Sequence, residues 1–420
     1  MDRPEAPPET VEGHRPEVPP ESIEGSVDGL VEGDPLDFIE EPAEGHRLAL
    51  TYALLTFLSC FLELGIVVDA VAQGAALDPS PVLSLVEGKG RFLWDLGVLL
   101  LAFHAATLLT RRLTISDPAR LGSLAIGALW LLARPGGVVG TATGVFLATL
   151  GIQYLRNNLK ARTQLSVSYK ALPRLAGFAL AFLYSPPTFA VLSMLALGVY
   201  LFGFPINMSI WFRQRSPQSS IRNVVLSLSK GPKSEIRNLK SPIRSYLTMA
   251  FHSAHYFAFG YGVPVLFAGR YGFPVASLGL VYTAGWLGYY LISHLLPPSP
   301  RYLAWGHLVS ALGILVLAFS PTPWPALLAW TITGFGGGTI FMLSRLWAAN
   351  PYDPAAMDLW DNGANVVGLL LFLWAWGQGA LSMSFLAAAF LAFAAALVAA
   401  GLQETPHKVT AGQLGGLVQS

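Results

Sequence analysis

Twelve transmembrane helices arranged as two six-helix bundles are the architecture that this sequence predicts, in an all-α polytopic membrane protein with a disordered acidic tail before the first helix. Three observations predict it. Only 12% of the 420 residues are charged and 53% are hydrophobic, whereas soluble proteins of this size keep about 25% charged residues. Two long apolar regions of similar size follow the tail, and a basic segment separates them.

The acidic tail covers residues 1–45. It holds 14 of the 25 acidic residues and only two bases, and it is rich in Pro, Glu and Gly. With so few large apolar side chains, a segment cannot offset its ordering entropy by burial, so we expect it to be disordered. Its charge is also opposite to that of a signal peptide, whose charged end is basic.

The first six-helix bundle is expected within residues 46–210. A helix needs about 20 apolar residues to cross a bilayer. Six candidate spans satisfy or approach this length, the third and fifth being short: Leu48–Ala72, Phe92–Leu109, Ala119–Ala133, Val138–Leu155, Leu172–Tyr184 and Phe189–Ile210.

The second bundle is expected within residues 246–402, followed by a tail at residues 403–420. Its candidate spans are Tyr246–Ala268, Phe273–Leu296, Tyr302–Phe319, Trp324–Leu346, Leu359–Gly377 and Leu381–Leu402. Residues 211–245 form the linker between the bundles, with eight Lys and Arg residues against one acid, Glu235. A total of eleven spans is the alternative.

The distribution of bases predicts the orientation in the membrane, because cytoplasmic loops carry an excess of Lys and Arg. With the amino terminus inside, the cytoplasmic loops and the linker hold 18 of these residues and the outer loops hold 4. We therefore expect a multi-pass protein of the cytoplasmic (inner) membrane with both termini in the cytoplasm. The basic linker could also contact anionic lipid headgroups.

Two stretches of the second half resemble the major facilitator superfamily (MFS). One is the short turn before Arg301, a base that begins the ninth span, and the other is the glycine-rich run Gly334–Gly338 in the tenth. The first half departs from the family pattern, because Arg111 and Arg112 precede Asp117, whereas the usual signature places glycine and aspartate before its bases. The resemblance implies a divergent member, with these three residues and Arg301 in gating or structural roles.

Paired small residues support the twofold repeat. Gly140 and Gly144 lie in the fourth span, and Gly334 and Gly338 lie at the equivalent place in the tenth. Small residues four apart let two helix backbones approach closely. In transporters built from repeats such segments flank the central site, and generic helix packing is the alternative interpretation.

Ionisable groups inside a membrane span are functional candidates by default because they are costly there. Glu63 lies 16 residues after Arg47 in the first span, roughly 24 Å along the helix at 1.5 Å per residue. A carboxylate at that depth could bind and release protons, or it could be a protonated, hydrogen-bonded core group. His104 lies near the middle of the second span.

The seventh span holds His252 and His255, with Tyr256 beside them. Residues three apart share a helix face, and imidazoles titrate near neutral pH, which suits proton coupling or an anionic substrate. Neutral histidines bonded to neighbouring helices are the alternative. A zinc site needs three or four ligands, and no third ligand has a suitable spacing, so we predict no metal.

Glycine and proline interrupt the outer part of the seventh span, at Gly260 and Pro264. Proline removes a backbone hydrogen bond and kinks a helix. Broken helices of this kind often border a binding site and act as gates. A static kink is the alternative.

These residues predict a secondary active transporter that moves a small solute by alternating access and is coupled to protons or another cation. The alternative is an MFS-like membrane scaffold or assembly factor without transport. We expect no enzyme, because no nucleophile or metal set faces either surface, and no cofactor. The bilayer and a small solute are the predicted partners of a monomer, with no role for nucleic acid.

Overall fold

The computed structural model describes residues 43–77, 89–110, 116–133, 136–162, 167–203, 240–347, 350, 352–378 and 380–404. Most of the predicted acidic tail, most of the linker, nearly all of the carboxyl-terminal tail, Arg111 and Arg112 lie outside these ranges, as does the side chain of Asp117. The expectations that concern them stay predictions.

Helices occupy all six spans predicted for the first half. They are α1 (Ala43–Leu77), α3 (Lys89–Leu109), α4 (Asp117–Ala133), α5 (Gly137–Arg162), α6 (Val167–Ala179) with the 3₁₀ turn η1 (Ala181–Leu183), and α7 (Pro186–Gly203). Most extend beyond the apolar windows, because a helix continues past the hydrocarbon region into polar residues such as Arg156 and Lys160 of α5.

The second half also fills its six predicted spans, two of them with broken helices. The elements are α10 (Lys240–Phe259), α11 (Gly262–Tyr271), α12 (Val275–Leu295), α13 (Pro300–Phe319), α14 (Pro323–Gly338), η3 (Thr339–Phe341), α15 (Met342–Arg345), α16 (Pro354–Gly377) and α17 (Leu381–Ala399). The seventh span is α10 plus α11, and the tenth is α14, η3 and α15. The predicted count of twelve is confirmed within the described residues.

Within the described ranges, six helices are individually long and apolar enough to cross a membrane. They are the helical stretches His46–Gln73, Gly137–Lys160, Val275–Ile292, Pro300–Phe319, Pro323–Arg345 and Leu381–Ala399. Three shorter apolar helices accompany them in α3, α4 and α7. Together with the exposed large apolar side chains along these helices, such as Trp324, Phe390 and Leu397, this arrangement is that of a multi-pass membrane protein.

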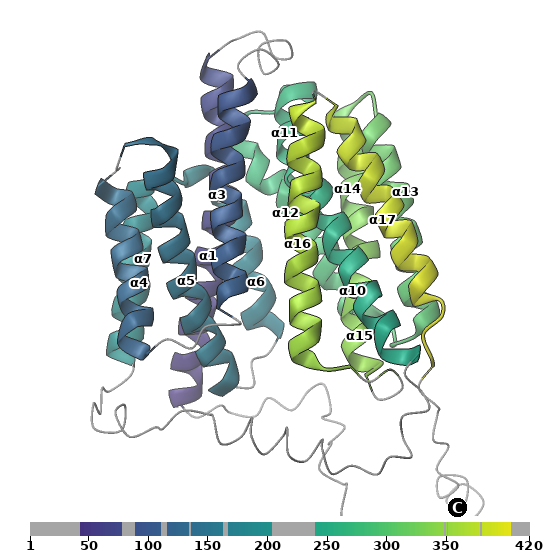
Figure 1. The fold of residues 1–420 in the computed structure, drawn as a ribbon, viewed down its shortest axis with the longest axis horizontal. Helices are drawn as coiled ribbons and strands as arrows, with labels where there is room; N and C mark the ends of the chain where they lie inside the picture. Colours follow the sequence, from purple (N-terminus) through teal and green to yellow (C-terminus); the bar gives the residue numbers. More distant parts are fainter. Residues whose placement is uncertain are drawn as a thin grey trace, which may run out of the picture. The chain divides into compact units, whose positions relative to one another are not determined.

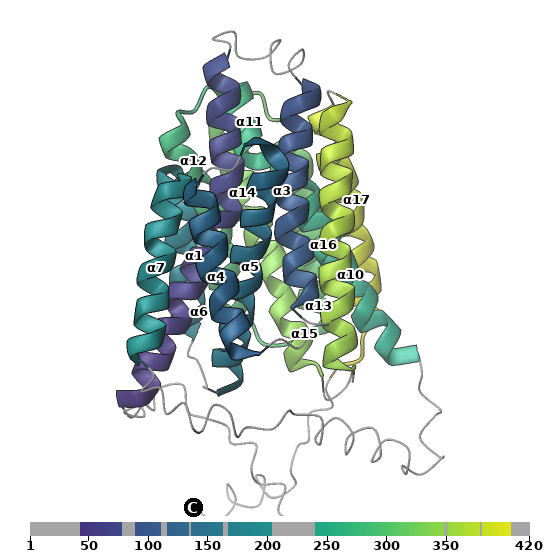
Figure 2. The same ribbon diagram turned by 60° about the vertical axis from the view of Figure 1, so that its left-hand side comes forward.

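Two helix pairs make the most extensive contacts between the two sets of six helices, and α1 also packs against α11 and α12. α3 of the first set packs against α16 of the second, and α6 packs against α12. Figures 1 and 2 both show α3 beside α16. α3 and α16 are the second and eleventh spans, and α6 and α12 are the fifth and eighth. In a 6+6 repeat the second span corresponds to the eighth and the fifth to the eleventh, so the repeat exchanges one pair for the other. The interface therefore has the twofold relation expected of a 6+6 repeat.

One end of the bundles, which we call the linker end, holds the start of α1, the end of α7 and the start of α10 (Figures 1 and 2). The short helix α15 lies at the same end. The opposite end, which we call the far end, holds α11 and the last turns of α1 and α16.

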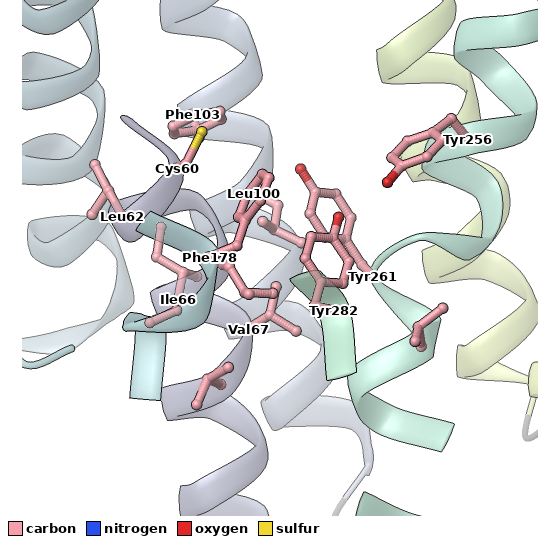
Figure 3. Close-up of a cluster of buried hydrophobic side chains, with 14 of the residues drawn as sticks. Cys60, Leu62, Ile66, Val67, Leu100, Phe103, Phe178, Tyr256, Tyr261 and Tyr282 are labelled. Atoms are coloured by element: carbon pink, nitrogen blue, oxygen red, sulfur yellow. The ribbon is translucent and has the colours of Figure 1, made fainter. Parts of the chain in front are cut away.

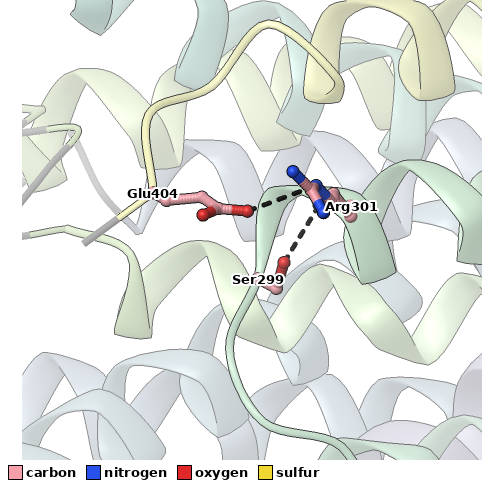
Figure 4. Close-up of polar contacts among 3 residues, drawn as sticks. All are labelled: Ser299, Arg301 and Glu404. Atoms are coloured by element: carbon pink, nitrogen blue, oxygen red, sulfur yellow. Dashed lines mark hydrogen bonds and ion pairs between the residues drawn. The ribbon is translucent and has the colours of Figure 1, made fainter. Parts of the chain in front are cut away.

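The ninth span begins at Pro300 with a capped helix, and Arg301 lies in its first turn, where the sequence places a base. The Ser299 hydroxyl accepts a hydrogen bond from the Arg301 backbone N–H, and Pro300 occupies the first turn (Figure 4). Such a cap satisfies a donor that has no partner inside the helix. The exposed Arg301 side chain forms an ion pair with Glu404, with 3.4 Å between Nε and Oε1. This contact holds the chain after α17 against the start of α13.

The glycines of the tenth span pack against the eighth span without intervening side chains. A Cβ atom added to Gly334 would lie 1.8 Å from the Gly285 carbonyl oxygen, and one on Gly338 would lie 2.1 Å from that of Tyr289. In the fourth span, a Cβ on Gly144 would lie 2.7 Å from the Leu131 side chain, and the Gly140 carbonyl accepts a hydrogen bond from the Trp130 indole. These glycines therefore serve helix packing inside each bundle.

Replacing Gly334 with alanine should strongly destabilise the second bundle. The added methyl group meets backbone, which cannot rotate away, and overpacking typically costs about 1–3 kcal/mol or more. We expect a lower melting temperature in detergent for Gly334→Ala. Gly198→Ala in α7 is the matched control, because nothing lies within 4 Å of its added Cβ. Equal melting temperatures for the two variants would contradict the close approach of α14 and α12.

Candidate functional site

A cavity of about 410 Å³ lies between the two bundles. Residues of both halves line it, and the lining runs from mid-span residues of α1, α3 and α10 to residues at the linker end, such as Lys160, Ser344 and Tyr352. A volume of this size suits a small solute, because ligand pockets typically measure about 300–1,000 Å³.

Charged side chains line the two walls of the cavity unequally. Arg156, Lys160 and Arg174 come from α5 and α6 of the first bundle, while Asp361 comes from α16 of the second. Asp361 accepts a hydrogen bond from the Ser253 hydroxyl of α10. The first-bundle wall is therefore the more basic one, apart from Glu63 of α1.

Glu63 is joined across the cavity to the other bundle. The Tyr261 hydroxyl donates to Glu63 Oε1 at 2.8 Å, and the Tyr261 hydroxyl oxygen lies 2.8 Å from His104 Nε2. Because the Tyr261 proton is given to the carboxylate, its oxygen is free to accept the His104 N–H. The three residues come from α1, α3 and the seventh span, so this Glu63–Tyr261–His104 bridge ties the first bundle to the second.

The break in the seventh span places Tyr261 in the bridge. α10 ends at Phe259 and α11 begins at Gly262, so Tyr261 occupies the junction. Its ring is almost fully buried at 1% exposure. Figure 3 shows Tyr261 and Tyr282 of the second bundle beside Phe178 of the first. The Phe178 ring packs on the Tyr282 ring, with centroids 5.0 Å apart, and this contact joins the two bundles near the bridge.

A buried histidine relay lies in the second bundle. His307 Nδ1 lies 2.9 Å from the Leu303 carbonyl, so it carries the proton, and His307 Nε2 must accept from His252 Nδ1 at 3.1 Å. His252 Nε2 can then accept from the Tyr289 hydroxyl at 3.4 Å. The relay thus runs from a backbone carbonyl of α13 to His252, which lines the cavity.

His307 is a third imidazole beside His252 and His255, and its distance from them in the sequence does not reveal this contact. The ring centroids of His252, His255 and His307 lie 5.1–5.9 Å apart. Nevertheless, the described residues contain no group of three or more His, Cys, Asp or Glu arranged to hold a metal ion. Hydrogen bonds along the relay account for the geometry of His252 and His307.

Replacing His307 with leucine should destabilise the protein, because it leaves His252 Nδ1 buried without its partner. The cost of such an unsatisfied group is about 1–3 kcal/mol. His255→Leu is the matched comparison, since the buried His255 Nε2 already has no hydrogen-bond partner. We expect the melting temperature to fall in His307→Leu and to change little in His255→Leu. A larger fall for His255→Leu would contradict the relay.

The cavity brings together most of the predicted solute- and proton-binding residues. Glu63, His104, His252 and Tyr256 line it, whereas His255 packs inside the second bundle against Phe259 and His307. Gly260 and Pro264 flank the break that positions Tyr261.

Two residues that line the cavity, Arg174 and Asp361, and Tyr261 of the bridge were not predicted as site residues from the sequence. Arg174 counts as a loop base in the topology argument, and Asp361 reads as the solvated start of the eleventh span, but α16 begins at Pro354 and carries Asp361 into the cavity. Tyr261 reads as an aromatic neighbour of the histidines. The signal for Arg174 was its position within an apolar span.

Comparison with known proteins gives a match of structure only. No protein-family model matches the chain, and no curated protein matches its sequence. A peptide transporter POT in complex with sulfate matches with a TM-score of 0.57 at 15% identity, over 86% of this chain and 94% of that chain. The human organic anion transporter MFSD10 (TETRAN) matches with a TM-score of 0.53 at 14% identity, over 86% and 100%.

A mutant of the nucleoside transporter NupG matches with a TM-score of 0.54 at 14% identity, over 84% of this chain and 98% of that chain. The matched chains are covered almost completely, so the likeness extends over both bundles. The chain is a multi-pass membrane protein with an MFS-like fold of two six-helix bundles.

Proposed function

We propose that this protein is a secondary transporter that moves a small solute by alternating access, with Glu63 as the proton carrier. The observation that carries the proposal is the bridge: the one carboxyl group that α1 contributes to the cavity lining is hydrogen-bonded to the opposite bundle. A proton taken up at this position changes a contact between the two bundles, and these bundles must move relative to each other in alternating access.

The bridge couples protonation to conformation through the strength of one hydrogen bond. A hydrogen bond to an ionised carboxylate is roughly twice as strong as one between neutral groups. With Glu63 ionised, the Tyr261 hydroxyl binds it strongly and holds α1 against α11. With Glu63 protonated, the same contact is weaker, and the far end of the bundles can separate.

The cavity opens toward the linker end, where Lys160, Ser344 and Tyr352 lie. The excess of bases that the sequence places in the loops at that end supports a cytoplasmic location for it. In this orientation the structure is an inward-facing state in the cytoplasmic membrane, with both termini inside, and the bridge seals the cavity from the outer side.

The resemblance to solved structures supports a solute as the cargo. The matched proteins are named as transporters of peptides, nucleosides and organic anions. A scaffold without transport would need neither a cavity of about 410 Å³ nor a titratable group inside it, so transport is the function that this geometry supports best.

Reconstitution into liposomes tests the proposal. Purified protein in vesicles with a pH-sensitive dye inside would receive glycylglycine, uridine or benzoate under an inward proton gradient. We expect at least one class to accelerate proton entry over protein-free vesicles. If every solute leaves the proton flux unchanged and a stable protein partner is recovered from membranes instead, the assembly-factor alternative replaces this proposal.

A further inference from the structure

Arg174 is a cation in a membrane span, and no ion pair joins it to an acidic residue in the described part of the chain. It lies in α6 and lines the cavity. Its Nη1 donates to the Tyr290 hydroxyl at 2.7 Å, and its guanidinium carbon lies 5.9 Å from the centre of the Tyr290 ring.

This arrangement leaves the Arg174 guanidinium with further N–H donors for a ligand. A guanidinium has five N–H donors, and the hydrogen bond to Tyr290 uses one of them. A charge removed from water is strongly destabilising unless an opposite charge or several hydrogen bonds compensate it. Arg174 therefore has both the capacity and the energetic reason to bind an anion in the cavity.

The residues around Arg174 reinforce its preference for an anion. Arg156 of α5 lines the same cavity, and both guanidiniums act electrostatically on Glu63 and Cys60 of α1. Yet Glu63 accepts its described hydrogen bond from Tyr261 of the opposite bundle. The charge of Arg174 on this wall is therefore available to a ligand in the cavity.

We propose that Arg174 forms bidentate hydrogen bonds to an oxyanion of the transported solute. This oxyanion is a carboxylate or a similar planar or tetrahedral acid group. Tyr290 of α12 is the positioning residue that holds the guanidinium in the cavity. The proposal rests on the proposed function, whose substrate class it specifies: the solute carries a negative charge, and it binds between α6 and the opposite bundle.

A thermal-shift experiment on the purified full chain tests this assignment with defined probes. Sulfate and benzoate supply the oxyanion, and benzamide matches benzoate in shape without the charge. Anything that binds only the folded state raises its melting temperature. We expect saturable stabilisation by benzoate or sulfate and none by benzamide.

Variants then locate the site. Arg174→Gln should weaken the apparent affinity by about thirtyfold or more, since truncating one partner of a buried charge pair costs about 2 kcal/mol or more. Arg174→Lys, which keeps the charge but loses the planar fork, should weaken it less. Arg301→Gln is the control, because that residue pairs with Glu404 outside the cavity.

Each contrary result overturns the assignment. Equal stabilisation by benzamide, no stabilisation by either anion, or undiminished affinity in Arg174→Gln would do so. If Arg174→Gln does not fold, the wild-type comparison of benzoate with benzamide and the Arg174→Lys affinity still decide. Solute-driven proton flux that needs Glu63 but shows no oxyanion preference would reject this inference and leave the proposed transport function standing.

Discussion

Replacing Glu63 with glutamine is expected to abolish solute-driven proton entry into proteoliposomes while leaving the protein folded. Glutamine keeps the shape of the side chain and can still accept the Tyr261 hydrogen bond through its carbonyl oxygen, but it cannot carry a proton. We expect the proton flux to fall to that of protein-free vesicles. Solute exchange at equal pH on both sides should persist, because exchange needs no net proton movement.

Glu404→Gln is the matched control for this experiment. Glu404 is exposed and pairs with Arg301 away from the cavity, so its variant should transport like the wild type. Proton flux that survives in Glu63→Gln at the wild-type rate would remove Glu63 from the proposed mechanism and require another carrier.

Replacing Tyr261 with phenylalanine is expected to release the far end of the bundles. The ring stays to pack against Phe257 and Phe372, but Glu63 and His104 lose the oxygen that joins them. A hydrogen bond to a charged group contributes about 1.5–3 kcal/mol, so the ratio of closed to open far ends should fall by about tenfold to hundredfold.

Spin labels can measure this shift. In a background of Cys60→Ser, labels at Gln73→Cys on α1 and Ala276→Cys on α12 report the separation of the two bundles at the far end. The wild type should give one short distance and Tyr261→Phe an additional longer one. Tyr271→Phe is the control, because its hydroxyl bonds Ser320 within the second bundle. Identical distance distributions in all three proteins would contradict the bridge.

The twelve spans could be predicted from the sequence because burial in lipid demands long apolar runs, which are visible residue by residue. Their ends could not. α10 begins at Lys240, inside the segment predicted as linker, because bases and hydroxyls can occupy a helix once it leaves the hydrocarbon. The break at Gly260 was expected from its glycine and proline, whereas the one at Thr339–Phe341 was not; there Gly338, the last residue of α14, packs against the Tyr289 carbonyl of α12.

The site was predictable only where a residue was unusual on its own. Glu63 and His104 stand out as rare polar groups in apolar spans. Their joint contact with Tyr261 spans 198 and 157 residues of sequence, and no local pattern announces it. For the same reason His307 could not be paired with His252, nor Arg174 with Tyr290, until the helices were placed side by side.

Labelling of Cys60, the single cysteine, is the most direct measurement of alternating access in the native chain. Cys60 lines the cavity, so a small membrane-impermeant thiosulfonate should modify it in inside-out vesicles and not in right-side-out vesicles. Tyr261→Phe should add modification from the outer face, and Cys60→Ser should abolish all labelling. Modification of the wild type from the outer face alone, or no response to Tyr261→Phe, would contradict an inward-facing cavity sealed by the Glu63–Tyr261–His104 bridge.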